Sequence, residues 1–315
     1  MIKIVKGILR SLVFVILGLS VACDSKVKTT PGALGDYETP SPPQIHVVNY
    51  PLHYITARIV GENAQVILPE SSGSDPAFWR PSDEEIQAYQ GSDLVLLWGA
   101  DFAKWVQNVS LPFDRVVDTG ASLRDRYIFE EEGVSHSHGD SPAHSHGETA
   151  FNTWLDIKLL ILQAQAVHDT LVDRYPRFAT EFGDGLGKLQ RDLTELDQSF
   201  VDAVPAGFEQ VVFASHPVYQ YFGRGYGVSL ISFHWEPNET PDVAAWAGFD
   251  ELQEKTGARW MLWEGKPTAE TSERLKQAGV TPIEFFTLSG LPRSGDFLSG
   301  MKANAERLRA AFQSP

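Results

Sequence analysis

The chain has 315 residues, 43% of them hydrophobic, and a formal net charge of −15 at pH 7. This length and composition suffice for one large or two medium globular domains. The acidic excess argues against nucleic acid as a partner, because it repels phosphate backbones, and it concentrates cations near the protein surface.

The first 22 residues have the composition of an export signal. Lys3, Lys6 and Arg10 precede an apolar stretch over residues 11–19, and small residues follow. The apolar stretch is shorter than the ~20 residues that cross a bilayer, and no later run is longer and as apolar. We predict that residues 1–22 are a signal peptide, whose removal changes the net charge to −18.

Cys23 is the only cysteine, and it lies where bacterial lipoproteins carry the cysteine that becomes lipidated. Simple cleavage is the alternative, but an exported thiol without a partner would then lack a purpose. Residues 23–43, rich in Pro, Thr and Gly, are predicted to be a lipidated tether. The lipid would be the only contact with the membrane, and the protein would lie in the periplasm or on the cell surface as a monomer.

Residues 44–150 alternate short strand-like runs with helical patterns, which predicts parallel βαβ units and a first α/β lobe. The runs are IHVVNY, AQVILPE, SDLVLLWG and DRVVDTG. Between them, Ser82 and Glu85 are spaced as the capping box that starts a helix.

A histidine-rich loop is predicted at residues 135–147, SHSHGDSPAHSHG. Imidazole is a common metal ligand, so this tract indicates an auxiliary metal-binding loop. A solvated, pH-responsive loop is the alternative interpretation. The four side chains concerned are His136, His138, His144 and His146.

Residues 151–206 have helical periodicity and are predicted to include a helix that connects two lobes. Gly183, Gly185 and Gly187 lower helix stability by about 1 kcal/mol each relative to alanine, so we expect a break there.

Residues 207–315 repeat the strand alternation with EQVVFAS, VSLISFHW, ARWMLWEG and TPIEFFTL, and end in an amphipathic helix. The sequence has no glycine-rich phosphate loop, no GxSxG elbow and no HExxH. The predicted fold is α/β, with two parallel-sheet lobes, a long connecting helix and a ligand cleft between the lobes.

Polar residues just after predicted strands are the candidate ligands, because open parallel sheets bind ligands at the carboxyl ends of their strands. A histidine, two carboxylates and an amide suit a divalent cation such as zinc, manganese or iron. These candidates are His216, Asp75, Glu264 and Asn152.

Each candidate also has an ordinary structural interpretation. Asp75 could cap the turn before Pro76, and Asn152 could be a loop hydrogen-bonding residue. His216 is the strongest candidate, since Ser-His-Pro ends an apolar strand and Pro217 can open the next helix. Glu236 and its neighbour His234 are interpreted as contacts to the ligands or as packing groups.

Four motifs in order resemble the metal-binding proteins of bacterial zinc and manganese ABC importers, of the zinc-uptake type. They are RPSDEEIQAYQGSDLVLLWGADFAKW, TWLD after a histidine-rich loop, FASHPVYQYFGRGYG and HWEP. The resemblance covers nearly the whole mature chain. It implies two α/β lobes joined by a long rigid helix.

The resemblance also implies a ligand set of three histidines and one carboxylate. Here only His216 matches a family histidine, and Asn152 falls on another. Counting back from Arg80 places Asp75 on the first histidine, whereas counting forward from Gly73 places Ala77 there.

The usual last aspartate of the family falls near Thr287. Glu264, on the neighbouring strand, would then supply the missing negative charge, with Thr287 beside the ligands rather than among them.

We therefore expect a solute-binding protein, not an enzyme, that captures a divalent metal and delivers it to an ABC permease in the inner membrane. Zn²⁺ is the first choice and Mn²⁺ the second. One alternative keeps the fold but binds a chelated metal or a small organic solute. Another is a metal-dependent hydrolase, for which the sequence offers no general base.

Overall fold

The computed structural model describes residues 41–69, 76–129, 149–236 and 238–313. Residues 42–315 form one compact unit. The predicted signal peptide, Cys23 and most of the tether lie outside the described residues, as does the histidine-rich loop. In the described part, no helix is long and apolar enough to span a membrane.

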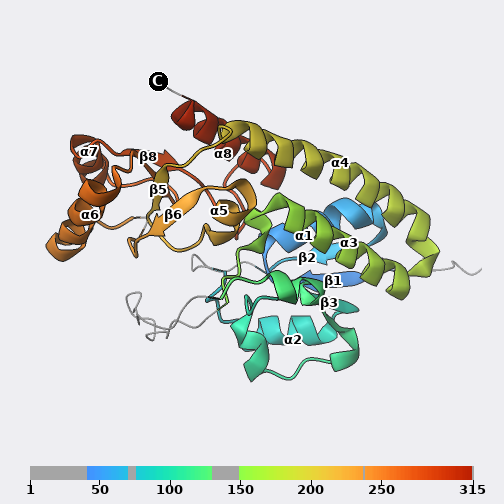
Figure 1. Ribbon diagram of the computed structural model, residues 1–315. Coiled ribbons are helices and arrows are strands. Elements are labelled where there is room, and N and C mark those ends of the chain that lie inside the picture. Colours follow the sequence, from blue (N-terminus) through green and yellow to red (C-terminus); the bar gives the residue numbers. More distant parts are fainter. Residues whose placement is uncertain (1–40, 70–75, 130–148, 237, 314–315) are drawn as a thin grey trace, which may run out of the picture. The chain divides into compact units, whose positions relative to one another are not determined.

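The first lobe is built on a four-stranded parallel sheet with the order β2-β1-β3-β4 (Figure 1). Its register places Ile45 between Val66 and Leu94. All four predicted strands are confirmed, with bounds β1 (Gln44–Val47), β2 (Gln65–Ile67), β3 (Leu94–Leu97) and β4 (Val116–Asp118).

The second lobe repeats this arrangement with the order β6-β5-β7-β8, again all parallel. Phe213 pairs with Ile231 on one side and Met261 on the other. The predicted strands are again confirmed, as β5 (Val211–Ala214), β6 (Ser229–Ser232), β7 (Trp260–Trp263) and β8 (Thr281–Glu284).

The shared strand order creates the same topological switch in both lobes. The chain leaves the first strand for one neighbour and then crosses to the other side for the third strand. The carboxyl ends of β1 and β3, and of β5 and β7, therefore flank the two crevices where such sheets bind ligands.

Two helices of the first lobe begin at side-chain caps. In α1 (Tyr50–Val60), the Asn49 carboxamide oxygen accepts a hydrogen bond from Leu52 N at 2.9 Å. In α2 (Asp83–Gly91), Ser82 and Glu85 form the predicted capping box. These caps satisfy backbone N–H groups that a helix start leaves without partners.

The long helix α4 (Ala179–Ala203) runs unbroken through Gly183, Gly185 and Gly187, so the predicted break is wrong. At Gly185 a Cβ would lie 2.4 Å from the Ile59 carbonyl oxygen, so the absent side chain lets α4 approach the end of α1 closely. Tertiary packing thus outweighs the low helix propensity of glycine.

Helix α4 connects the two lobes, as predicted. It packs against α1 and α3 (Ile157–Arg174) of the first lobe and against α8 (Phe297–Phe312) of the second (Figure 1). One apolar cluster contains Leu94 of the first sheet, Leu193 of α4 and Leu262 of the second sheet. The lobes therefore share a continuous core.

The remaining helices of the second lobe are α5 (Gln220–Tyr226), α6 (Val243–Thr256) and α7 (Ala269–Gln277). Helix α5 begins at Gln220, so the prediction that Pro217 opens it is wrong: Pro217 lies in a turn. Short 3-10 segments occupy Gly61–Asn63, Lys104–Asn108, Phe113–Arg115, Ala121–Arg126, Thr153–Leu155 and Pro176–Phe178.

Two glycine substitutions in α4 test whether the close contact with α1 explains Gly185. Gly185→Ala is expected to lower the free energy of unfolding by about 1–3 kcal/mol, because the new methyl group has no room. Gly183→Ala is the matched control, since no atom lies within 4 Å of its Cβ position. The control should raise the free energy of unfolding by about 0.5–1 kcal/mol through helix propensity. Urea denaturation of both variants measures the difference, and equal effects would contradict the packing argument.

Candidate metal-binding cleft

His216 lies in the turn that directly follows β5. The strand ends at Ala214, and Ser215 N donates to Leu262 O of β7 at 2.8 Å. Val218 N donates to His216 O at 2.9 Å and closes the turn. The half-buried imidazole is therefore carried by a backbone that is fixed on both sides.

Glu264 is the first residue after β7 and is held by its neighbours on two strand ends. Its backbone N–H donates to Ser215 Oγ at 3.2 Å, and its carboxylate Oε1 accepts a hydrogen bond from Thr287 Oγ1 at 2.8 Å. The ends of β5, β7 and β8 are thus tied around one carboxylate. Glu264 and Thr287 are therefore in contact, and the role of Glu264 as a metal ligand stays a prediction.

Asn152 is buried, with 4% of its surface exposed, at the start of the 3-10 segment Thr153–Leu155. Its Nδ2 donates to Val218 O at 3.1 Å, in the same turn as His216. Its Oδ1 has no hydrogen-bond partner among the described residues. A buried acceptor without a partner is costly, and a bound cation would satisfy it.

Trp154 fixes this segment to the second lobe. Its indole N–H donates to Thr287 O at 2.7 Å, and the side chain is fully buried. Through Trp154 and Thr287, the Asn152 loop and Glu264 are joined by hydrogen bonds. The candidate amide and carboxylate therefore share one supporting network.

The remaining predicted site residues are either outside the described part of the chain or do not contribute a described ligand. Asp75, like the four histidines of the 135–147 loop, lies outside the described residues. Ala77, the alternative first position, is buried at 3% exposure and offers only a methyl group. His234 is exposed after β6, with its ring centroid 6.1 Å from that of His216, and Glu236 follows it, half-buried.

The described residues do not complete a metal site by themselves. Among them, no three His, Cys, Asp or Glu side chains lie close enough together to hold an ion. Asn152 is not of these types, so its amide oxygen could add one donor to those of His216 and Glu264. The full set of four predicted ligands remains a prediction.

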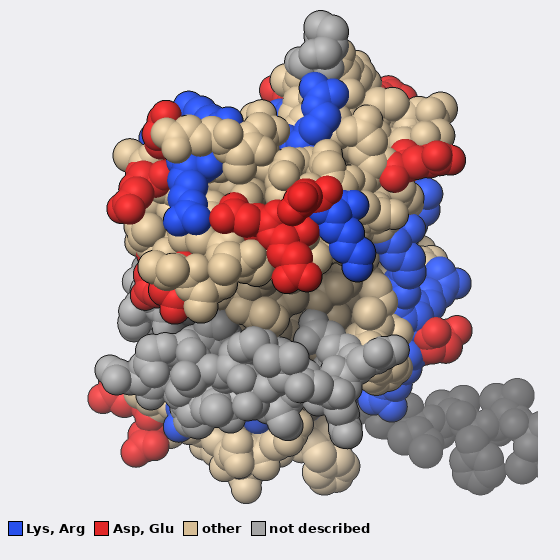
Figure 2. Space-filling model, turned by 60° about the vertical axis from the view of Figure 1, so that its left-hand side comes forward, with Lys and Arg blue, Asp and Glu red and all other residues tan. Residues whose placement is uncertain are grey.

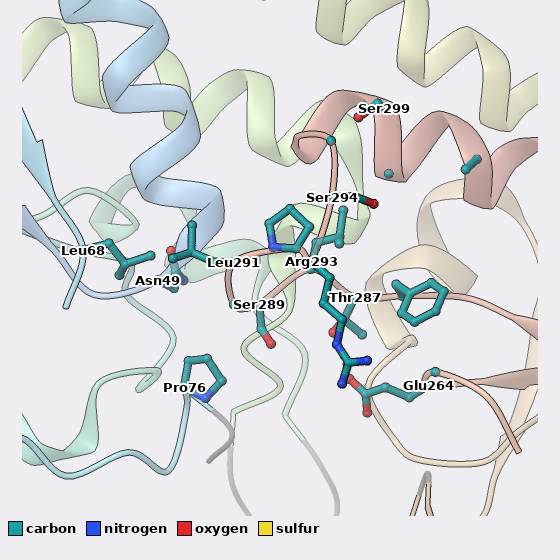
Figure 3. Close-up of a pocket in the computed structure, with 18 of the residues that line it drawn as sticks. Asn49, Leu68, Pro76, Glu264, Thr287, Ser289, Leu291, Arg293, Ser294 and Ser299 are labelled. Atoms are coloured by element: carbon teal, nitrogen blue, oxygen red, sulfur yellow. The ribbon is translucent and has the colours of Figure 1, made fainter. Parts of the chain in front are cut away.

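A cavity of about 1210 Å³ opens beside Glu264 and Thr287 (Figure 3). The first lobe contributes Asn49 and Pro76 to its wall, and the loop between β8 and α8 contributes Arg293. Thr287 is the one residue of this loop that the sequence predicts near the site; Arg293 follows no motif or periodicity and was not predicted.

The loop between β8 and α8 has a strained backbone where it lines the cavity. Leu288 has a φ of 57°, which is unusual for a residue other than glycine. Its side chain lies over Gly300 in α8, where a Cβ would come within 2.7 Å of Leu288 Cδ1. Strain of this kind is typical of functional segments that their surroundings hold in place.

Charge on the surface is mixed despite the overall acidic excess. Figure 2 shows acidic and basic side chains next to one another on the face that it presents. In the core, burial and the Glu264 carboxylate raise the pKa of the fully buried Tyr219 well above its usual value. Tyr219 therefore stays neutral and donates its hydroxyl hydrogen bond to Phe285 O at 2.8 Å.

Two parallel-sheet α/β lobes, a long helix that packs on both and ligand candidates at the strand switch define a class of bilobed solute-binding protein. A family model described as "Zinc-uptake complex component A periplasmic" matches residues 45–311. The chain belongs to this zinc-uptake family. The resemblance inferred from the four motifs is thereby confirmed, as is the expectation of a binding protein rather than an enzyme.

Curated relatives are similar at low identity. "Zinc-binding protein AdcA" of Streptococcus pyogenes is 25% identical over 279 residues, which cover 82% of this chain and 54% of the relative. "Manganese-binding lipoprotein MntA" of Halalkalibacterium halodurans is 23% identical over 188 residues, covering 58% of this chain and 57% of that protein. The chain thus spans about half the length of the curated relatives it matches.

Solved structures confirm the fold. Zn(II)-bound AdcA from Streptococcus pneumoniae superposes with a TM-score of 0.73 at 19% identity, over 87% of this chain and 58% of that one. The lipoprotein YcdH from Bacillus subtilis gives a TM-score of 0.72 at 17% identity, over 85% and 98% of the two chains. The predicted architecture is therefore correct.

Two further histidines lie in the first lobe, away from the second-lobe turn. His46 is buried in β1, with Nδ1 2.5 Å from Ser92 Oγ, and His53 lies in α1. Burial lowers the pKa of both imidazoles below the usual value. Both are therefore neutral in the folded protein at neutral pH.

The lowered pKa values of these two histidines predict acid sensitivity. Below the ordinary histidine pKa of about 6.5 the unfolded chain binds protons that the folded chain does not, so stability falls as the pH decreases. The free energy of unfolding, measured by urea titration, should decrease between pH 7 and pH 5. His46→Asn should make that decrease smaller, and an unchanged pH dependence would show that His46 is not responsible.

Proposed function

We propose that this protein is an extracytoplasmic lipoprotein that captures a divalent metal ion in the cleft and delivers it to an ABC permease. The observation that carries the proposal is the pairing of His216 and Glu264 at the carboxyl ends of neighbouring strands, with Ser215 bonded to Glu264 N. This is the switch point at which a parallel sheet binds its ligand.

The donor types favour zinc, with manganese second. Imidazole nitrogen and carboxylate oxygen are both good zinc ligands, whereas manganese prefers a site richer in oxygen. The partnerless Oδ1 of Asn152 supports a third, oxygen donor. Asp75 is proposed as a further ligand: the residue after it, Pro76, lines the cavity beside Glu264.

The histidine-rich loop is proposed as an auxiliary site that collects ions and passes them to the cleft. Its four imidazoles within 13 residues raise the local concentration of ligands. The acidic net charge of the chain also attracts cations and so raises their concentration near the loop. Deleting the loop should slow metal capture more than it weakens binding in the cleft.

Membrane attachment through Cys23 and delivery to a permease are proposed from the export signal and the family. A relative in Streptococcus pneumoniae, 22% identical, is named "Zinc-binding lipoprotein AdcA". The position of Cys23 after an apolar stretch supports the same anchor here.

His216→Ala is expected to weaken zinc binding at least tenfold in a chain of residues 24–315 that lacks residues 135–147. The removed imidazole is a direct donor, so its loss cannot be offset by the remaining oxygens. His168→Ala is the matched control, because His168 lies on α3 and contacts Asp169 instead.

Calorimetric titration with zinc and then manganese measures both variants. The tighter metal in the unsubstituted chain identifies the cargo. An unchanged affinity in His216→Ala would contradict the assignment of the cleft.

A further inference from the structure

The described wall of the cavity beside Glu264 carries more positive than negative charge. Among the described residues that line it, the charged ones are Glu264, Lys266, Arg293 and Arg307, whereas the whole chain has 41 acidic and 26 basic residues. A bare divalent cation gains from one carboxylate but is repelled by three cations. The wall as a whole therefore suits a ligand that also bears negative charge.

Arg307 is held in position for such a ligand. Its Nη1 donates to Asn304 Oδ1 at 3.1 Å, and its guanidinium lies 5.5 Å from the centroid of the Phe286 ring. Asn304 Nδ2 in turn donates to Phe286 O at 2.7 Å. A guanidinium fixed in this way keeps further N–H donors for a carboxylate, at little cost in side-chain entropy.

Arg293 lies in the loop between β8 and α8 and lines the same cavity as Arg307 of α8. Figure 3 shows its guanidinium extended across the cavity toward the Glu264 carboxylate. An arginine directed at a ligating carboxylate would weaken a bare cation's binding, but it could hold the anionic part of a larger ligand next to the metal.

Asn49 provides an independent observation at the far wall of the cavity. The side chain is fully buried, and its Oδ1 is occupied by the helix cap to Leu52 N. Its Nδ2 donates to no described residue. This N–H group requires an acceptor, which a bare cation cannot supply and a carboxylate oxygen can.

The size of the cavity agrees with an organic ligand. Its volume of about 1210 Å³ is somewhat larger than the ~300–1,000 Å³ typical of small-molecule sites, so it has room for a metal bound together with an organic chelator. Leu68, Trp79 and Leu291 add apolar surface to the wall. An ion alone would contact only its few donors and leave this surface unused.

We infer that the cavity takes a divalent metal ion together with a small polycarboxylate chelator. Glu264, which accepts a hydrogen bond from Thr287, coordinates the metal. Asn49, Arg293 and Arg307 bind the carboxylates of the chelator. The inference rests on the proposed function and specifies the chemical class of the cargo.

The test compares zinc chloride, zinc nitrilotriacetate and zinc citrate as ligands of residues 24–315 without residues 135–147, so that the histidine-rich loop cannot bind zinc or its chelates. Nitrilotriacetate leaves coordination positions on zinc open for protein donors. Native mass spectrometry should show a bound species that retains the chelator. Calorimetry should show at least tenfold tighter binding of one chelate than of zinc alone.

Arg293→Gln and Arg307→Gln should each weaken binding of the chelate at least fivefold without weakening binding of zinc alone. Arg293 is exposed, so its variant should fold normally, and Arg191→Gln on the exposed side of α4 is the matched control. Adducts of bare zinc only, or chelate affinities unaffected by both variants, would overturn the inference and leave metal capture standing. Failure to bind zinc in any form would overturn the proposed function itself.

Discussion

The candidate site depends on the pair of hydrogen bonds that fix Glu264. Ser215 Oγ accepts a hydrogen bond from the Glu264 backbone N–H, and Thr287 Oγ1 donates one to the Glu264 carboxylate. The ends of three strands therefore meet at this one residue. Short parallel strands alone would leave these ends free to move apart. With the bonds in place, His216 on one strand end and Glu264 on the next keep a defined relation, which a metal site requires.

The same constraint extends to the first lobe through aromatic side chains and the long helix. Trp154 donates to Thr287 O, and α4 shares its apolar core with both sheets. Because the core is continuous, any movement that widens or narrows the cleft would have to leave these buried contacts intact. The shared core and these hydrogen bonds therefore hold the strand ends of both lobes in place beside the cleft.

The sequence was sufficient to predict all eight described strands, because each is a short apolar run bounded by turn residues. It was insufficient at Gly185, where contact with Ile59 O, a partner distant in sequence, decides the structure. It was also wrong at Pro217, which turns the chain after His216 instead of starting α5. Local signals predict elements well, but they do not report which distant backbone a residue will meet.

The candidate site shows the same division. His216 and Glu264 were identifiable because they follow apolar strands, and the structure joins Thr287 to Glu264. Asn49 and Arg307 were not, since one caps a helix and the other lies within one, and only the fold brings them to the same cavity. Their N–H groups are the basis of the inference that the ligand is a metal chelate and not a bare ion.

Anomalous diffraction at the zinc absorption edge, from crystals of residues 24–315 grown with zinc, would show whether His216 and Glu264 bind the same ion. We expect a strong anomalous peak within coordinating distance of both the His216 imidazole and the Glu264 carboxylate. Zinc bound only elsewhere, with neither side chain coordinating it, would show that the two residues are not a metal site.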